Sequence, residues 1–186
     1  MRRSSDETKA AILAAAREQF GSAGFQGATI RAIAADAGVD PAMVMRYYGS
    51  KDKLFAAAAE FDLRFPDLGA IDHEQVGHSL VRHFLERWEG DEAMVILLRS
   101  SATNGEAAQR MQHIFGTQLQ PLVAALVPPG QSALRAGLIA TQILGMAFCR
   151  FVLRLPPVVA MSRDEIVEWL GPTIQRYCGG PDRAET

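Results

Sequence analysis

The sequence is poor in cysteine and lysine and carries no strong excess of charge of either sign. Its 186 residues include two cysteines, Cys149 and Cys178, too few and too far apart for a disulfide scaffold or a zinc knuckle. Only three lysines occur and the formal net charge is −2, so no broad basic field favours nucleic acid as a partner. Composition alone therefore indicates an ordinary globular chain and argues mildly against a DNA-binding one.

The chain also lacks the long apolar runs that mark export or membrane insertion. Charged residues from Arg17 onward interrupt the Ala-rich stretch near the N-terminus, a pattern unlike that of a signal peptide. The most apolar segment, residues 136–149, lies between two arginines and is short for a membrane span, as is typical of a buried core helix. We therefore expect a cytoplasmic protein with no membrane partner.

Apolar residues recur at spacings of three and four along the whole chain and do not alternate over any useful stretch. This pattern predicts an all-α fold of about nine helices joined by short loops. The expected helices cover residues 6–23, 29–37, 41–48, 51–64, 74–89, 92–101, 104–127, 132–155 and 163–178. Pro121 lies inside one of them and is expected to kink or break it.

Two short helices, at residues 29–37 and 41–48, are predicted to form a helix-turn-helix unit. Ala34 provides the small side chain that a close helix crossing needs, Gly38 serves the turn, and Val44 packs the second helix onto the first. Neither helix is long enough to be stable alone, so their packing against each other and against a neighbour is expected.

The outward side of the second short helix carries small and apolar side chains. Pro41 starts the helix, and Ala42, Met43, Met45 and Arg46 lie on or near its outward side. Such a face suits close entry into the major groove of DNA, where Ala and Met contact thymine methyl groups and Arg reaches guanine or phosphate.

Side chains suited to phosphate surround this helix in the sequence. They are the hydroxyls of Thr29 and Tyr47, the guanidinium of Arg31 and the ammonium of Lys51. Backbone amides at the helix starts add donors and a positive dipole end. A single surface Arg or Lys is usually only solvated, whereas the whole set predicts an interface with double-stranded DNA.

The segment from Thr29 to Leu54, preceded by an Ala-rich helix that ends in residues 20–25, resembles the DNA-binding domain of the TetR family of transcriptional regulators. The resemblance implies a dimer that binds a palindromic operator, with a variable helical C-terminal domain that binds a small inducer and dimerises. The DNA-facing positions it implies are Thr29, Arg31, Ala42, Met43, Arg46, Tyr47 and Lys51. The position of Met45 is often Tyr in the family, so contacts there are expected to be apolar.

Two further segments, residues 97–104 and 145–156, resemble a C-terminal domain common in actinobacterial members of this family. The implied organisation is an N-terminal three-helix DNA-binding domain at 1–50, a connecting helix at 51–64 and a helical bundle for ligand binding and dimerisation at 65–180. The implied function is a ligand-responsive repressor that an inducer releases from its operator. The alternative is a helical ligand-binding or interaction protein whose helix-turn-helix has lost DNA binding.

One expected helix is apolar almost all round, which a monomer's own core cannot bury completely. It begins at Ser132 and ends at Leu155, and its apolar residues cover more than one face. The helix from Arg163 to Cys178 carries one apolar stripe. Together they predict an isologous four-helix homodimer interface. A buried core helix in a monomer is the alternative.

The middle helices are expected to line a cavity for an unknown small-molecule inducer. Its candidate residues combine apolar and polar side chains: Phe84, Trp88, Met94, Leu98, Arg99, Thr103, Met111, Phe115, Gln118, Gln142 and Met146. Each of them also fits plain core packing. Arg99 is a charge in an apolar helix and needs a partner, for which Glu86, Glu92 and an anionic inducer are the candidates.

Features of an enzyme or a metalloprotein are missing. His73, His78 and His83 follow at intervals of five, which places successive rings on different sides of a helix. Glu74 and His78 are four apart, but no third ligand stands nearby in the sequence. No nucleophile elbow, phosphate-binding loop or dinucleotide fingerprint occurs. We expect neither a catalytic site nor a metal or cofactor.

Overall fold

The structure is a computed structural model that describes residues 4–66, 71–89 and 91–179. Within these ranges every regular element is helical, which confirms the all-α prediction. The chain forms two compact units, one from Met1–Phe61 with Asp91–Met111 and the other from Asp62–Gly90 with Gln112–Thr186. These units cross the boundaries expected from the sequence, because a segment from the middle of the chain returns to the N-terminal unit.

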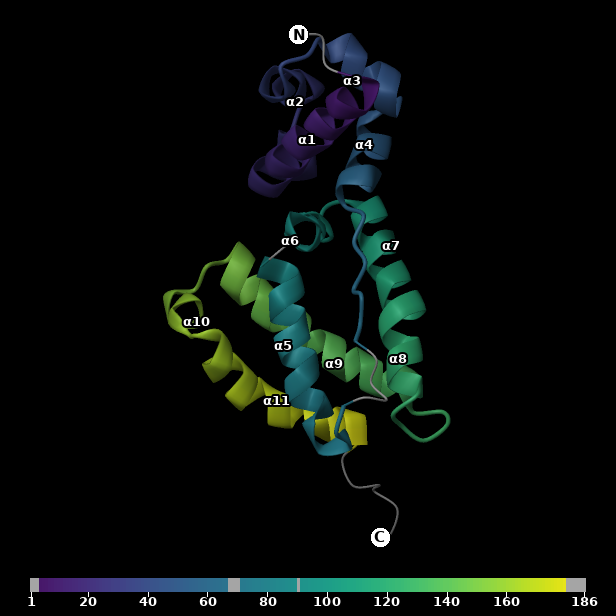
Figure 1. Cartoon of the computed structure of the whole chain (residues 1–186), viewed down its shortest axis with the longest axis vertical. Coiled ribbons are helices and arrows are strands. Elements are labelled where there is room, and N and C mark those ends of the chain that lie inside the picture. Colours follow the sequence, from purple (N-terminus) through teal and green to yellow (C-terminus); the bar gives the residue numbers. More distant parts are fainter. Residues whose placement is uncertain (1–3, 67–70, 90, 180–186) are drawn as a thin grey trace. The chain divides into compact units, whose positions relative to one another are not determined.

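The first unit starts with four helices, each of which begins after a polar capping residue. They are α1 (Ser5–Gly27), α2 (Ile30–Ala37), α3 (Pro41–Tyr48) and α4 (Lys51–Ala58) (Figure 1). The side-chain oxygens of Ser4, Thr29, Asp40 and Ser50 accept hydrogen bonds from backbone N–H groups of the first turns. The predicted starts of the second, third and fourth helices agree with these caps.

Two helix ends in this unit differ from the prediction. α1 kinks at Gly24, whose φ of 69° and ψ of 176° are not helical, and then continues past it. α4 ends at Ala58, so the expected connecting helix to residue 64 is wrong. Pro66 disfavours helical backbone in the residue before it. The N–H of Leu63 instead donates to Oε1 of Gln118 at 2.7 Å, which pairs this extended backbone with a side chain.

A later helix completes the first unit. Helix α6 (Glu92–Ser100) begins after the N-cap Asp91 and packs against α1. Nη1 of Arg99 donates to the carbonyl oxygens of Gly21 and Ser22 in α1. The contact joins the two helices through a charged side chain and two backbone acceptors, so α6 packs with the helices of the first unit.

The second unit contains the remaining helices, and α7 (Gly105–Ile114) begins in the first unit and ends in the second. The other elements are η2 (His73–Gln75), α5 (Val76–Glu89), the π-helical turn η3 (Phe115–Leu119), α8 (Gln120–Ala124), α9 (Ser132–Ala147), the π-helical turn η4 (Phe148–Val152), α10 (Pro156–Ala160) and α11 (Arg163–Gly179). Helices α5 and α11 lie side by side (Figure 1).

The crossing of α5 and α11 depends on glycine. A Cβ atom on Gly77 would lie 2.4 Å from the carbonyl oxygen of Gly171. Gln175 of α11 also secures the start of α5, because its Oε1 accepts from the N–H of Gly77 at 2.7 Å and its Nε2 donates to the carbonyl of His73 at 2.8 Å. The two helices therefore meet backbone to backbone.

Prolines account for the breaks in the long helices. The expected helix at 104–127 is divided into α7, η3 and α8, with Pro121 in the first turn of α8. Because Pro has no N–H to donate, this break confirms the prediction. The expected helix at 132–155 ends in η4, and Arg154 then adopts a φ of 53°. Pro156 starts α10, a short helix that we did not predict, at the position where Pro favours a helix start.

One stretch of the described residues, Ser132–Val152, is long and apolar enough to cross a membrane by length and composition. Two arginines within it are bonded to carbonyl oxygens of later helices. Nη1 of Arg135 donates to Tyr177 at 3.3 Å, and Nη1 of Arg150 donates to Val158 at 2.7 Å. These bonds attach one side of the stretch to α10 and α11 within the second unit.

Candidate nucleic-acid interface

The turn between α2 and α3 has the construction that the sequence predicted. Gly38 adopts a left-handed conformation with φ 66° and ψ 40°, and its N–H donates to the carbonyl of Ala35 at 3.1 Å. Ala34 and Val44 are both fully buried. The small residue, the turn glycine and the packing valine therefore act together to hold α3 against α2.

The outward side of α3 is open to solvent. Among the predicted DNA-facing residues, the exposed ones are Thr29, Arg31, Pro41, Ala42, Met45 and Arg46, and the half-buried ones are Met43, Tyr47 and Lys51. Met45 keeps 42% of its surface exposed, although it is apolar. Three consecutive helices, α2, α3 and α4, together with the N-cap Thr29, thus carry all of these residues within one unit.

The inward side of α3 is attached to α1. The hydroxyl of Tyr48 donates to the carbonyl oxygen of Lys9 at 3.0 Å. Burial raises the pKa of Tyr48 above its ordinary value, and the nearby charge of Arg17 partly offsets the rise. Tyr48 is therefore a neutral anchor at physiological pH, and α3 presents its outward side from a fixed position.

Tyr47 has a partner that sequence reasoning missed. Its hydroxyl oxygen lies 3.1 Å from Oγ of Ser5, and either group is able to donate. A tyrosine hydroxyl both donates and accepts, so this contact leaves capacity for a second partner such as a phosphate oxygen. The capping box of Ser4 and Glu7 signals where α1 begins, but no spacing links Ser5 to α3.

Thr29 and Arg31 lie at the start of α2. Oγ1 of Thr29 accepts from the N–H of Ala32 at 3.1 Å, so it acts as the N-cap. Because the oxygen is the acceptor in this bond, the hydroxyl hydrogen remains available as a donor to phosphate. Arg31 follows in the first turn and is exposed. Both side chains suit contacts with the DNA backbone.

Lys51 begins α4 and lies over an aromatic ring. Its Nζ is 4.6 Å from the centroid of Phe25, whose ring meets that of Phe55 edge-on at 5.1 Å. A cation over a ring face is stabilised by the ring quadrupole, so Phe25 positions the ammonium. Sequence reasoning missed Phe25, because the two residues lie in different elements.

The predicted ligand-cavity residues are divided between the units. Met94, Leu98, Arg99, Thr103 and Met111 belong to the first unit, and Phe84, Trp88, Phe115, Gln118, Gln142 and Met146 belong to the second. The described hydrogen bonds of Arg99 go to carbonyl oxygens of α1, and Glu86, one of the expected partners, belongs to the other unit. The side chain of Glu92, the other expected carboxylate, lies outside the described residues.

A row of aromatic side chains occupies the second unit, with Phe84 and Trp88 buried and Phe151 half-buried. The Trp88 ring centroid lies 5.6 Å from that of Phe84 and 6.4 Å from that of Phe151. Nε1 of Trp88 is buried and has no acceptor among the residues that the structure describes. An unpaired buried N–H costs about 1–3 kcal/mol, so an acceptor placed here would relieve that cost.

Gln142 and Met146 line a different feature of the second unit. This is an apolar groove of about 340 Å³ whose walls come from α9, α11 and the connection before α11. Gln118 is engaged elsewhere, with the backbone N–H of Leu63. Two of the predicted ligand residues of this unit, Gln142 and Met146, therefore lie together at one groove.

The histidines of α5 serve packing and hydrogen bonding. Nε2 of His83 lies 2.7 Å from the carbonyl oxygen of Leu63, and a Cβ atom on Gly171 would lie 2.6 Å from the ring of His78. Over the described ranges, no three His, Cys, Asp or Glu side chains form a group able to hold a metal.

The chain is similar to known regulators over both parts of its length. Residues 12–58 match the family described as bacterial regulatory proteins, tetR family, and residues 74–178 match the tetracyclin repressor-like C-terminal domain. A TetR-family regulator from Streptomyces coelicolor A3 is 26% identical with a TM-score of 0.60, over 95% of this chain and 97% of that one. The comparison with curated proteins gives no match.

A transcriptional regulator from Rhodococcus sp. Rha1 is similar in fold, with a TM-score of 0.67 and 20% identity over 89% of this chain and 92% of that one. The C-terminal family match alone covers more than half of the chain, and the N-terminal match contains the helix-turn-helix described above. The chain therefore belongs to the TetR family and is a ligand-responsive DNA-binding transcriptional regulator.

Proposed function

We propose that the chain is a repressor that binds a palindromic operator as a homodimer and is released from it by a small-molecule inducer. The observation that carries the proposal is the exposed face of α3, on which Ala42, Met45 and Arg46 are all open to solvent. An apolar exposed face on a short, well-anchored helix suits the floor of the major groove.

In the proposed complex α3 enters the major groove. Arg46 contacts guanine or phosphate, and Met45 contacts thymine methyl groups. The hydroxyls of Thr29 and Tyr47 and the ammonium of Lys51 bind phosphate oxygens on either side of the groove. The polar residues set the register of the protein on DNA, and the groove face reads the bases.

The homodimer is proposed to form through α9 and α11. Helix α9 and the turn η4 expose the apolar side chains of Leu134, Leu138 and Phe148. Exposed apolar patches of this kind mark interaction surfaces. A two-fold dimer also presents two copies of α3, and a palindrome requires them to be spaced by about 34–36 Å, one turn of DNA.

The inducer is proposed to bind in the C-terminal domain with an apolar body and at least one hydrogen-bond acceptor. The support comes from the aromatic row of Phe84, Trp88 and Phe151 and from the unpaired buried N–H of Trp88. The inducer acts by its differential affinity for two conformers, of which only one matches the operator spacing. No enzymatic step is part of this proposal, and the protein acts in the cytoplasm.

The test compares two variants in a gel shift with DNA from upstream of the protein's own gene. The double variant Arg46→Ala/Tyr47→Ala is expected to lose specific operator binding while remaining a dimer in sedimentation. Arg82→Ala, an exposed arginine in α5, serves as the control and is expected to bind like the wild type. Unchanged affinity of the double variant would contradict the proposal. If no fragment binds above the nonspecific level at low salt, the protein has lost DNA binding.

A further inference from the structure

The groove between α9 and α11 is lined entirely by uncharged side chains. Thr141 and Gly145 line it from α9, and Ile166, Trp169 and Leu170 line it from α11. Its volume is about 340 Å³. A Cβ atom added to Gly145 would meet nothing within 4 Å, so the groove has open space above this glycine.

Trp169 stands at this groove and is 77% exposed, more than any other large apolar side chain among the described residues. A tryptophan buries about 150–250 Å² when it finds a partner, and it is the residue type most enriched at interface hot spots. An uncovered Trp beside an uncovered apolar groove therefore gives one surface both a protrusion and a recess.

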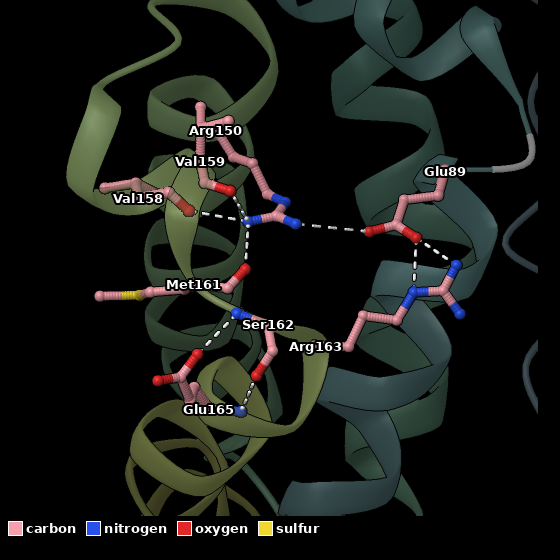
Figure 2. Close-up of polar contacts among 8 residues, drawn as sticks. All are labelled: Glu89, Arg150, Val158, Val159, Met161, Ser162, Arg163 and Glu165. Atoms are coloured by element: carbon pink, nitrogen blue, oxygen red, sulfur yellow. Dashed lines mark hydrogen bonds and ion pairs between the residues drawn. The ribbon is translucent and has the colours of Figure 1, made fainter.

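The wall of the groove is held in place by a polar cluster, shown in Figure 2. Nη1 of Arg150 donates to the carbonyl oxygens of Val158 at 2.7 Å and Met161 at 3.0 Å. The carboxylate of Glu89 pairs with Arg150, 3.8 Å away, and with Arg163 at the start of α11. Met161 lines the groove, so its backbone is fixed before any partner arrives. A preformed recess costs little ordering entropy on binding.

We propose that this groove receives Trp169 of the partner subunit, and that the two reciprocal insertions anchor the homodimer. The inference rests on the homodimer proposed above and adds the side chain that holds it together. A two-fold contact uses the same patch on both copies, so the patch must fit itself, and a protrusion next to a recess meets this requirement. The groove is also continuous in sequence with the exposed apolar residues of α9 and η4, because Leu138 and Phe148 flank Thr141 and Gly145 along the chain.

The first experiment measures iodide quenching of tryptophan fluorescence in the wild-type protein across a dilution series. Trp88 is 3% exposed and Trp169 is 77% exposed in the single chain, so quenching reports on Trp169. We expect quenching to fall and the emission to shift to shorter wavelength as dimer forms, in step with sedimentation equilibrium. Trp169→Phe assigns the signal. A dimer in which Trp169 remains as quenchable as in the dilute monomer overturns the proposal.

The second experiment compares dimer dissociation constants. Trp169→Ala is expected to raise the constant by about 100-fold or more, because two hot-spot side chains are lost per dimer. Glu168→Ala, an exposed neighbour on another side of α11, is the matched control. Gly145→Leu fills the groove and is expected to weaken the dimer similarly, whereas Ala133→Leu on the same helix is not. Circular dichroism and thermal melting establish that each variant is folded.

Failure of this inference and failure of the proposed function give different results. If the dimer binds operator and tolerates Trp169→Ala and Gly145→Leu, the inference about Trp169 is wrong and the repressor proposal is not affected. If the dimer shields Trp169 but binds no DNA, the repressor proposal is wrong and the inference about Trp169 is supported. A chain that stays monomeric at all concentrations contradicts both. Shielding of Trp169 by phosphatidylcholine–phosphatidylglycerol vesicles but not by dimerisation assigns the groove to lipid and overturns the inference.

Discussion

The hydroxyl oxygen of Tyr47 lies 3.1 Å from Oγ of Ser5, so the first residue of α1 contacts a side chain of the DNA-facing helix. Tyr47 is half-buried and follows the exposed Arg46 in α3. In the proposed complex the hydroxyl of Tyr47 accepts from Ser5 and donates to a phosphate oxygen. Ser5 is therefore a positioning residue for the DNA contact.

Replacement of Tyr47 by Phe removes the hydroxyl and keeps the ring. We expect operator affinity to fall by about 10-fold or more for each of the two contacts that a dimer loses, because a hydrogen bond to a charged group contributes about 1.5–3 kcal/mol. Ser5→Ala is expected to have a smaller effect, since packing still holds the ring. Fluorescence anisotropy with labelled operator measures both. Equal affinities of Tyr47→Phe and wild type would show that the hydroxyl makes no phosphate contact.

Lys51→Gln is expected to change the salt dependence of DNA binding. In a plot of log affinity against log salt concentration, each phosphate contact contributes about 0.9 to the magnitude of the slope. The slope should therefore become less steep by about 2 when a dimer loses two contacts. The loss should be similar for operator and for unrelated DNA. Lys53→Gln, an exposed lysine of the same helix, is the control. Identical slopes for the two variants would place Lys51 away from the phosphates.

Arg99→Met is expected to destabilise the protein by about 2–3 kcal/mol. The substitution removes the donor that the carbonyl oxygens of Gly21 and Ser22 share, in a partly buried setting. Arg99→Lys should recover only part of the loss, because an ammonium does not reproduce the geometry of the guanidinium. Urea unfolding measures the free energy. Arg82→Met, on the exposed side of α5, is expected to stay within about 0.5 kcal/mol of wild type.

Gly77→Ala is expected to destabilise the second unit by about 3 kcal/mol or more. The new methyl group would lie 2.4 Å from one backbone atom of α11 and 2.5 Å from another, and neither can move without separating the helices. Gly116→Ala is the control, because a Cβ atom there meets nothing within 4 Å. That change should stabilise by about 0.5–1 kcal/mol through the better helix propensity of Ala. Thermal melting of both variants distinguishes the close crossing from a general glycine effect.

The stability of the protein is expected to fall between pH 9 and pH 11. Burial raises the pKa of Cys178 to about 11 from an ordinary value of 9.0, and Arg135 partly offsets the rise. Between these values the unfolded chain has lost the thiol proton and the folded chain retains it. This contribution to stability is complete below pH 9 and declines by up to about 1.4 kcal/mol per pH unit.

Urea unfolding at several pH values, compared with Cys178→Ala, measures this contribution. The variant should show a shallower decline above pH 9, whereas Cys149→Ala serves as the matched cysteine control and should keep the wild-type decline. The raised pKa of Tyr48 acts in the same direction and remains in both variants. Equal slopes for wild type and Cys178→Ala would mean that the thiol is not buried in solution.

Local signals were enough to predict the helix-turn-helix. The caps at Thr29 and Asp40, the left-handed Gly38 and the start of α3 at Pro41 each involve residues at most a few positions apart. The interactions that stabilise these caps and this turn lie within one or two turns of helix, so residue type and spacing are enough to predict them. The exposed side of α3 followed from the same local periodicity.

Contacts between distant segments were beyond sequence reasoning. The carbonyl partners of Arg99 in α1 and the ring of Phe25 under Lys51 depend on how far each helix is offset along its neighbour. Periodicity gives the face of a helix but not this offset. The predicted end of α4 was wrong for a related reason. Oε1 of Gln118, from a later element, accepts a hydrogen bond from the backbone N–H of Leu63, and this bond favours an extended segment over a helix.

The passage of the chain between its two units limits how this protein can be recombined with its relatives. The chain changes unit after Phe61, after Gly90 and after Met111. A chimera that joins residues 1–61 to the ligand-binding part of another regulator would lose α6 and leave the carbonyl oxygens of Gly21 and Ser22 without the guanidinium of Arg99. An exchange that also carries residues 91–111 keeps that contact. The transferable DNA-binding module of this regulator is thus made of two separate stretches of sequence.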